Sequence, residues 1–150
     1  MKPATVFMGE MTSPEVEAYM ARAGDAATVI VPTGSTEQHG PHGALLTDML
    51  IAQEVARRAA PSVGALVAPS INYALSYPHV GFTGLVHIKV STFMSLIEDL
   101  CHSLASIGFR RIVFLNGHYD NTYAIAYACA TARSNGSGSR GLPCRRATPA

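Results

Sequence analysis

Hydrophobic positions along the chain alternate between short consecutive runs and longer segments with helical spacing. Residues 27–32, ATVIVP, are apolar at successive positions, which is typical of a strand covered on both faces of a parallel sheet. Residues 110–116, RRIVFLN, form a similar run, and residues 65–75, ALVAPSINYAL, contain another strand region. Apolar residues recur at helical spacing in the segments 13–24, 48–60, 91–108 and 121–132. Strands that alternate with helices predict an α/β fold with a parallel sheet.

Two polar motifs directly follow predicted strands. The first is VPTGSTEQHGPHGALLTD at residues 31–48, and the second is NGHYDN at residues 116–121. In parallel sheets, ligands bind at the carboxyl ends of the strands. We therefore expect both motifs to lie at the same edge of the sheet, where they would form a binding site.

The two motifs contain residues suited to divalent metal ions, namely Glu37, His39, Asp48, His118 and Asp120. Three carboxylates and two imidazoles form a mixed oxygen and nitrogen set that suits zinc or manganese. Five ligands exceed the share that one zinc ion usually takes from a protein. A carboxylate that bridges two ions, as in two-metal hydrolases, would use the set fully.

Each of these residues also has an ordinary structural interpretation. Asp48 alone would most often be a helix cap, and Glu37 alone a solvated loop charge. Spacing by itself leaves the metal site and the structural interpretation open, and a plain α/β domain without metal is the alternative. Ser35 beside a histidine is a weaker candidate for nucleophilic chemistry, because the sequence has no G-x-S-x-G motif. His79, His87 and His102 are interpreted as ordinary surface or core histidines.

Composition restricts the partners. Apolar residues make up 48% of the chain and charged residues 14%, and the formal net charge is +1. This excludes a basic nucleic-acid binder and favours small-molecule substrates or copies of the same chain. No apolar run reaches the ~20 residues that cross a bilayer, and the N-terminus lacks the apolar core of a signal peptide. We expect no membrane interaction and a cytoplasmic location.

The character of the sequence changes at residue 134. Residues 134–150, SNGSGSRGLPCRRATPA, have no apolar periodicity and are rich in Gly, Ser, Arg and Pro. We expect a domain at residues 1–133 followed by a disordered tail unrelated to it, such as the product of a frameshift. The arginines of this tail are too few to indicate a nucleic-acid site.

The two motifs closely resemble those of the creatininase (creatinine amidohydrolase) family. The resemblance extends from about residue 7 to residue 132 and includes the opening FMGEMTSPEVEAYM. It implies a three-layer α/β/α fold with a mostly parallel sheet, two zinc or manganese ions, and hydrolysis of a C–N bond in a cyclic amide or related substrate. A metal-activated bridging water would attack the carbonyl carbon.

The resemblance also implies roles for individual residues. Glu37 and His118 are expected to bind one ion, His39 and Asp120 the other, and Asp48 to bridge them. His42 and Tyr119 are candidates for catalytic or substrate-contacting roles, and Asn116 would flank the site.

Departures from the family pattern leave alternatives open. The creatininases proper carry Glu where Asp120 stands, and the segment around Phe82 and Gly84 fits the family only loosely, which favours a substrate other than creatinine. A sugar- or inositol-derived ring is one alternative. The family places its acid/base residue beyond the position of Arg133, so the chain resembles a fold truncated at its C-terminus. A metal-binding but inactive chain is a second alternative. The resemblance also implies that full-length relatives are homo-oligomers, since the family forms hexamers.

Overall fold

The computed structural model describes residues 5–135 and 144–147. Its α-helices are α1 (Ser13–Ala23), α2 (Thr47–Val63), α3 (Val90–Ser106) and α4 (Asn121–Asn135). Its strands are β1 (Thr28–Thr33), β2 (Leu66–Val67), β3 (Arg111–Asn116) and β4 (Cys144–Ala147). In these described residues, no helix combines the length and the apolarity needed to cross a membrane.

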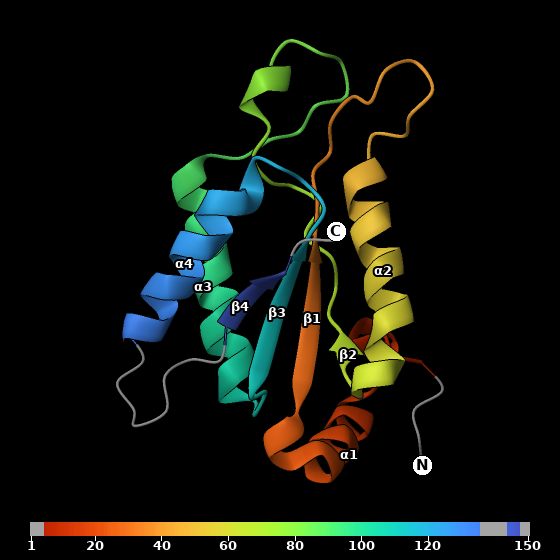
Figure 1. Ribbon diagram of the computed structural model, residues 1–150, viewed down its shortest axis with the longest axis vertical. Helices are drawn as coiled ribbons and strands as arrows, with labels where there is room; N and C mark the ends of the chain where they lie inside the picture. The colour runs from red at the N-terminus through yellow and green to blue at the C-terminus, as the bar shows by residue number, and fades with distance from the viewer. Residues whose placement is uncertain (1–4, 136–143, 148–150) are drawn as a thin grey trace.

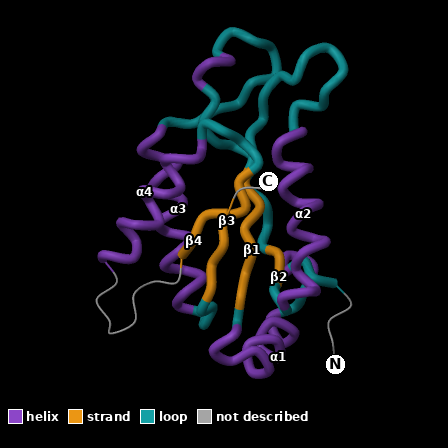
Figure 2. Tube along the Cα trace, viewed as in Figure 1, coloured by secondary structure: helices purple, strands orange, loops and turns teal. Residues whose placement is uncertain are grey.

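The strands form one sheet in the order β2-β1-β3-β4, and every neighbouring pair is parallel. β1 and β3 pair along their whole length, from Thr28 opposite Arg111 to Thr33 opposite Asn116. Their carboxyl ends therefore meet at one edge, the upper end of the sheet in Figure 1. The connecting loops gather above this edge, as Figure 2 shows in teal.

Helices cover both faces of the sheet. α2 packs on one face, and α3 and α4 lie on the other (Figure 1). All six residues of β1 are buried, and they alternate between two cores. Val29 and Val31 belong to the core beneath α3 and α4, whereas Ile30 packs with Ala56 and Ala60 of α2. The arrangement confirms the expected three-layer α/β/α fold with a parallel sheet, and it explains why the strand is apolar at successive positions.

Two predicted segments differ from the structure. The strand region expected within residues 65–75 is only Leu66–Val67, and the chain continues from it as a loop. Within the segment expected to be a disordered tail, Cys144–Ala147 form β4, which pairs with β3 from Ile112 to Leu115. The positions 136–143 and 148–150 of that segment lie outside the described residues, and the proposed domain boundary at residue 133 stays a prediction.

Two glycines let the strand ends approach the first turn of α2. A Cβ at Gly34, just after β1, would lie 2.3 Å from the backbone nitrogen of Met49. A Cβ at Gly117, just after β3, would lie 2.3 Å from the backbone oxygen of Asp48. Real Cβ atoms do not approach other atoms so closely. The absence of side chains at these positions therefore brings both strand ends against the start of α2.

Substitution of Gly117 by alanine tests this close approach. We expect Gly117→Ala to lower the free energy of unfolding by about 1–3 kcal/mol, because the added methyl group overpacks the contact with Asp48. Urea unfolding followed by circular dichroism measures the change. Gly9→Ala is the matched control, since its Cβ would meet Pro69 at an ordinary 3.5 Å. Equal stability of the two variants would contradict the close-approach argument.

Candidate metal site

The polar side chains predicted to form a site meet above the carboxyl ends of β1 and β3. Glu37 and His39 lie on the loop after β1, Asp48 lies in the first turn of α2, and His118 follows β3. The parallel pairing of β1 with β3 brings the two loops together, and Gly34 and Gly117 place both of them against α2. The order of elements therefore explains how residues far apart in the sequence share one edge.

Asp48 is the central residue of this cluster. Its Oδ1 lies 2.9 Å from Nε2 of His39, and its Oδ2 lies 2.7 Å from Nδ1 of His118. The buried Ser35 hydroxyl donates to the same Oδ2 at 2.8 Å. Each carboxylate oxygen of Asp48 thus faces a histidine from a different strand end.

These contacts determine the charge of Asp48. Burial raises the pKa of this carboxyl, but hydrogen bonds from Ser35 and from the two imidazoles outweigh burial. The pKa of Asp48 falls from 3.8 to about 2. Asp48 is therefore an ionised carboxylate over the whole neutral and mildly acidic range.

The pKa values of the two imidazoles are raised, whereas that of Asp48 is lowered. Burial lowers the pKa of His39 and of His118, yet the hydrogen bond of each to Asp48 raises the pKa above its ordinary value of 6.5. The Glu37 carboxylate adds to the effect at both histidines. A divalent cation would satisfy the same negative charge and would replace the protons.

The orientation of His39 is set by a backbone oxygen. Its Nδ1 lies 3.1 Å from the carbonyl oxygen of Glu37, which can only accept a hydrogen bond. Nδ1 therefore carries the proton, and Nε2 is the nitrogen available to a metal beside Asp48. This pattern, a ligand imidazole oriented by a carbonyl at its other nitrogen, is common in metal proteins.

Glu37 is buried although it carries a carboxylate. Its side chain is 7% exposed, and its Oε1 lies 3.5 Å from Nδ1 of His118. The other oxygen, Oε2, accepts a hydrogen bond from the hydroxyl of Ser76. A carboxylate so far from water requires a partner of opposite charge. His118 in its protonated form or a metal ion can supply that charge.

His118 is held by its neighbours in the NGHYDN motif. The Asn116 side chain accepts from the His118 backbone N–H at 3.2 Å and donates to its carbonyl oxygen at 2.6 Å. Nε2 of His118 is buried and has no hydrogen-bond partner among the described residues. Oδ2 of Asp120 approaches that Nε2 to 3.9 Å. The other ring nitrogen, Nδ1, lies between the carboxylates of Asp48 and Glu37 and is the one placed to face a cation.

Asn121 joins the loops behind the cluster. Its fully buried amide donates to the carbonyl oxygen of Gly34 at 3.0 Å and accepts from the backbone N–H of Leu75 at 3.1 Å. The loop after β1 and the loop after β2 are thereby tied to the start of α4. This tie positions the ligand-bearing loops without contacting a metal.

The structure separates the predicted residues into two groups. Ligand atoms of Glu37, His39 and Asp48 all lie within 4.8 Å of one another and could hold a metal ion. His118 joins this group through its contacts with Asp48 and Glu37. The Asp120 side chain lies at the margin and is 30% exposed. The chemistry of the donor set, two imidazoles and three carboxylates, fits zinc or manganese.

The two candidates for catalytic or substrate-contacting roles lie outside the cluster. His42 is exposed on the loop before α2, and Tyr119 is 77% exposed beside His118. Both side chains are accessible to a substrate. Ser35 donates its hydroxyl to Asp48 rather than to a histidine, so the base that a serine nucleophile requires is not beside it.

Sequence reasoning missed two residues beside Glu37, namely Ser76 and His79. His79 approaches Oε1 of Glu37 to 3.9 Å. Both residues lie in a segment without helical or strand periodicity, so no pattern placed them near the strand ends. The sequence signal that could have found them is a serine and a histidine three residues apart, directly after the predicted strand region 65–75.

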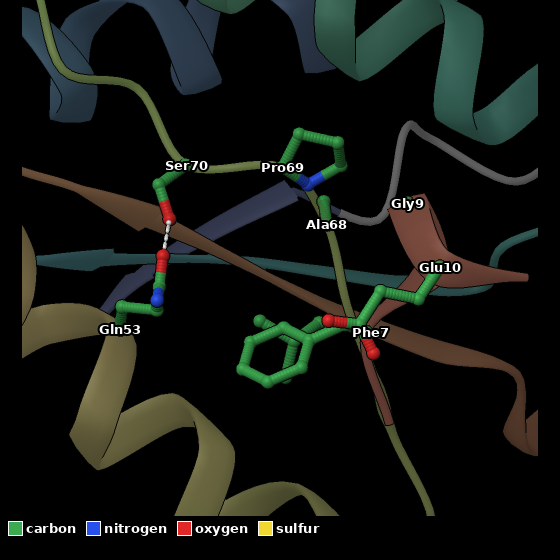
Figure 3. Close-up of a pocket in the computed structure, with 8 residues that line it drawn as sticks. Phe7, Gly9, Glu10, Gln53, Ala68, Pro69 and Ser70 are labelled. Atoms are coloured by element: carbon green, nitrogen blue, oxygen red, sulfur yellow. Dashed lines mark hydrogen bonds between the residues drawn. The ribbon is translucent and has the colours of Figure 1, made fainter. Parts of the chain in front are cut away.

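A separate pocket lies beside β2. Phe7, Pro69 and Glu10 line it, together with Gln53 of α2 (Figure 3). The Ser70 hydroxyl donates to Oε1 of Gln53 at 2.8 Å, as the dashed line shows. Its lining residues, all in the described part of the chain, include none of the predicted metal ligands.

Comparisons with known proteins identify the family of this chain. The model of the family described as creatininase, creatinine amidohydrolase, matches residues 9–147. The chain is 36% identical over 126 residues to a creatinine amidohydrolase of Pseudomonas putida, covering 81% of this chain and 48% of that protein. It is 43% identical over 122 residues to a mycofactocin precursor peptide peptidase of Mycolicibacterium smegmatis, covering 77% of this chain and 49% of that protein.

A more distant relative acts on a different substrate. The chain is 30% identical over 118 residues to a 3-dehydro-scyllo-inosose hydrolase of Thermotoga maritima, covering 78% of this chain and 37% of that protein. The chain therefore spans half or less of the length of these curated relatives.

Solved structures show the same fold. A mutant creatininase of Zn-Zn type superposes with a TM-score of 0.89 at 32% identity, covering 97% of this chain and 58% of that chain. A creatininase described with Mn superposes with a TM-score of 0.86 at 32% identity, covering 96% and 58%. The matching family model, the sequence relatives and the shared fold lead to one conclusion: this chain belongs to the creatininase family.

Proposed function

We propose that the chain is part of a metal-dependent amidohydrolase that cleaves a C–N bond in a small cyclic amide or a related substrate. The observation that carries the proposal is the placement of Asp48, whose two oxygens face His39 and His118 at 2.9 and 2.7 Å. A carboxylate between two imidazoles, with Glu37 beside it, is suited to bridge two divalent ions.

The residues divide naturally between two metal positions. Glu37 and His118 would hold one ion, because Oε1 of Glu37 and Nδ1 of His118 are 3.5 Å apart. His39 would hold the other through Nε2, on the opposite oxygen of Asp48. Asp120 is assigned to this second ion by the family resemblance, and its partly exposed side chain would turn toward it.

Bound zinc or manganese supplies a water of lowered pKa and polarises a carbonyl oxygen. The chain's own residues prepare the site for this chemistry. Asp48 and Glu37 provide the negative charge that retains the cations, and Asn116 orients His118 through two backbone contacts. The exposed Tyr119 and His42 would contact the substrate above the ions.

Two substrate classes are supported by the relatives. The Pseudomonas putida relative is named for creatinine, a cyclic amide, and the Mycolicibacterium smegmatis relative is named as a peptidase. Both names describe cleavage of an amide-type C–N bond. The inosose hydrolase relative supports a sugar-derived ring as the alternative substrate. A metal-binding chain without turnover is the alternative to catalysis.

Metal content tests the bridging role of Asp48. We expect the protein, loaded with zinc and desalted, to retain about two ions per chain, and Asp48→Asn to retain fewer than about one. The amide keeps the size of the side chain but removes the charge that attracts both ions. Elemental analysis measures the content. Glu54→Gln, an exposed carboxylate on the same helix, is the control and should match the unsubstituted protein. Unchanged metal content in Asp48→Asn would refute the bridge.

The raised pKa values of His39 and His118 predict that the stability of the fold depends on pH in opposite directions with and without metal. Without metal, the stability from the His39 and His118 contacts is complete below pH 6.5 and is lost as pH rises through their raised folded values. With zinc, stability rises over the same range, because the metal requires deprotonated imidazoles. The Asp48 contribution stays constant here, since its pKa is about 2.

Thermal unfolding measures this difference. The melting temperature with zinc, minus that with a chelator, should grow between about pH 6 and about pH 8. A difference that stays constant across this range would show that the two histidines do not exchange protons for metal.

Turnover separates the enzyme from the inactive alternative. The protein reconstituted with zinc or manganese is incubated with creatinine and, separately, with a short peptide, and the hydrolysis products are measured by mass spectrometry. We expect hydrolysis of one substrate that requires metal and is lost in Asp48→Asn, because the bridge holds the activating ions. Two bound ions with no hydrolysis of either amide would support the inactive metal-binding chain.

A further inference from the structure

The loop between β2 and α3 contacts the predicted ligand Glu37 at its carboxylate. The Ser76 side chain on this loop is buried, and its hydroxyl donates to Oε2 of Glu37. That oxygen is the one turned away from His118, whose Nδ1 lies beside Oε1. Ser76 therefore fixes one carboxylate oxygen and leaves the other directed toward the metal position.

The same loop contacts the ligand segment a second time through His79. Its Nδ1 lies 3.3 Å from Nε2 of Gln38, and Oε1 of Gln38 accepts from the backbone N–H of Gly40 at 2.9 Å. Because the backbone N–H can only donate, the Gln38 oxygen faces Gly40 and its NH₂ group faces His79. Nδ1 of His79 is therefore the acceptor. Through Gln38 and Gly40, these contacts hold the residues directly before and after His39.

The β2–α3 loop is itself held in place. The Thr36 hydroxyl donates to the Asn72 carbonyl oxygen at 2.8 Å, and its own carbonyl accepts from the Val86 N–H at 3.1 Å. Between these points, the Leu75 N–H donates to the buried Asn121 side chain at 3.1 Å. Ser76 follows this anchored residue directly. These anchors fix the loop, so the loop can hold the Glu37 side chain in place.

We propose that Ser76 and His79 are positioning residues that hold Glu37 and its loop in the metal-binding orientation, Ser76 at the carboxylate and His79 through Gln38. The inference rests on the metal binding proposed above. His79 is a supporting residue rather than an additional ligand, because its Nδ1 accepts from Gln38 and lies 3.9 Å from Glu37. Such supporting contacts commonly change metal affinity by about 10–100-fold.

Zinc affinity tests the inference directly, with no need for substrate. The affinities of the full chain and its variants are measured by competition with a chromophoric chelator. Ser76→Ala removes the hydroxyl donor, and we expect it to weaken zinc binding by about 10–100-fold. His102→Asn, an exposed histidine on α3, is the control and should bind as the unsubstituted protein does.

A pair of substitutions at His79 separates positioning from general packing. His79→Asn places an amide oxygen near the position of Nδ1 and can still accept from Gln38, whereas His79→Gln places its polar atoms near Nε2. We expect His79→Gln to weaken zinc binding by about 10–100-fold and His79→Asn to preserve most of the affinity. Urea unfolding in the presence of a chelator checks that each variant is folded. The His79 side chain is 30% exposed and tolerates both changes better than a buried site would.

The outcomes separate this inference from the proposed function. Zinc binding by the unsubstituted protein, with equal affinity in Ser76→Ala and both His79 variants, would overturn the inference and leave the proposed function standing. Equal weakening in His79→Asn and His79→Gln would overturn the role of Nδ1. No zinc binding by the folded, unsubstituted protein would overturn the proposed function and this inference together.

Discussion

The carboxylate of Asp48 lies between two imidazoles that come from different strand ends, and the site depends on this placement. Its position follows from the parallel pairing of β1 with β3 and from the contact of both strand ends with the first turn of α2. Gly34 and Gly117 permit that contact because any side chain there would overlap the α2 backbone. The requirement for close packing explains why each polar motif has a glycine directly after its strand.

The negative charge of the Asp48 and Glu37 carboxylates can be balanced in two ways. Without a cation, the carboxylates raise the pKa values of His39 and His118, and protons on these imidazoles balance the negative charge. Hydrogen bonds from the two imidazoles and from Ser35 in turn lower the pKa of Asp48. With a divalent ion, the metal replaces those protons. Proton binding and metal binding are therefore competing ways to neutralise one cluster, and the burial of Glu37 makes neutralisation necessary.

Family membership informs metal binding by this chain. The match to only about half of each relative bears on turnover. The described residues contain the sheet edge and the four clustered side chains Glu37, His39, Asp48 and His118. The matched segments cover only 48% and 49% of the lengths of two relatives. Metal binding is thus a question for the residues of this chain, whereas turnover concerns the whole protein.

The sequence by itself determined most of the element types and the parallel α/β class, and its resemblance to the creatininase family implied the three layers and the metal ligands. Consecutive apolar residues in β1 and β3, helical spacing in α2, and polar motifs after the strands are local patterns, and local patterns can be read without coordinates. Only the tertiary structure decided which oxygen of Asp48 faces which histidine, and that Asp120 lies at the margin. It also placed Ser76 and His79 beside Glu37, because the β2–α3 loop has no periodicity and its course depends on contacts with Thr36 and Asn121.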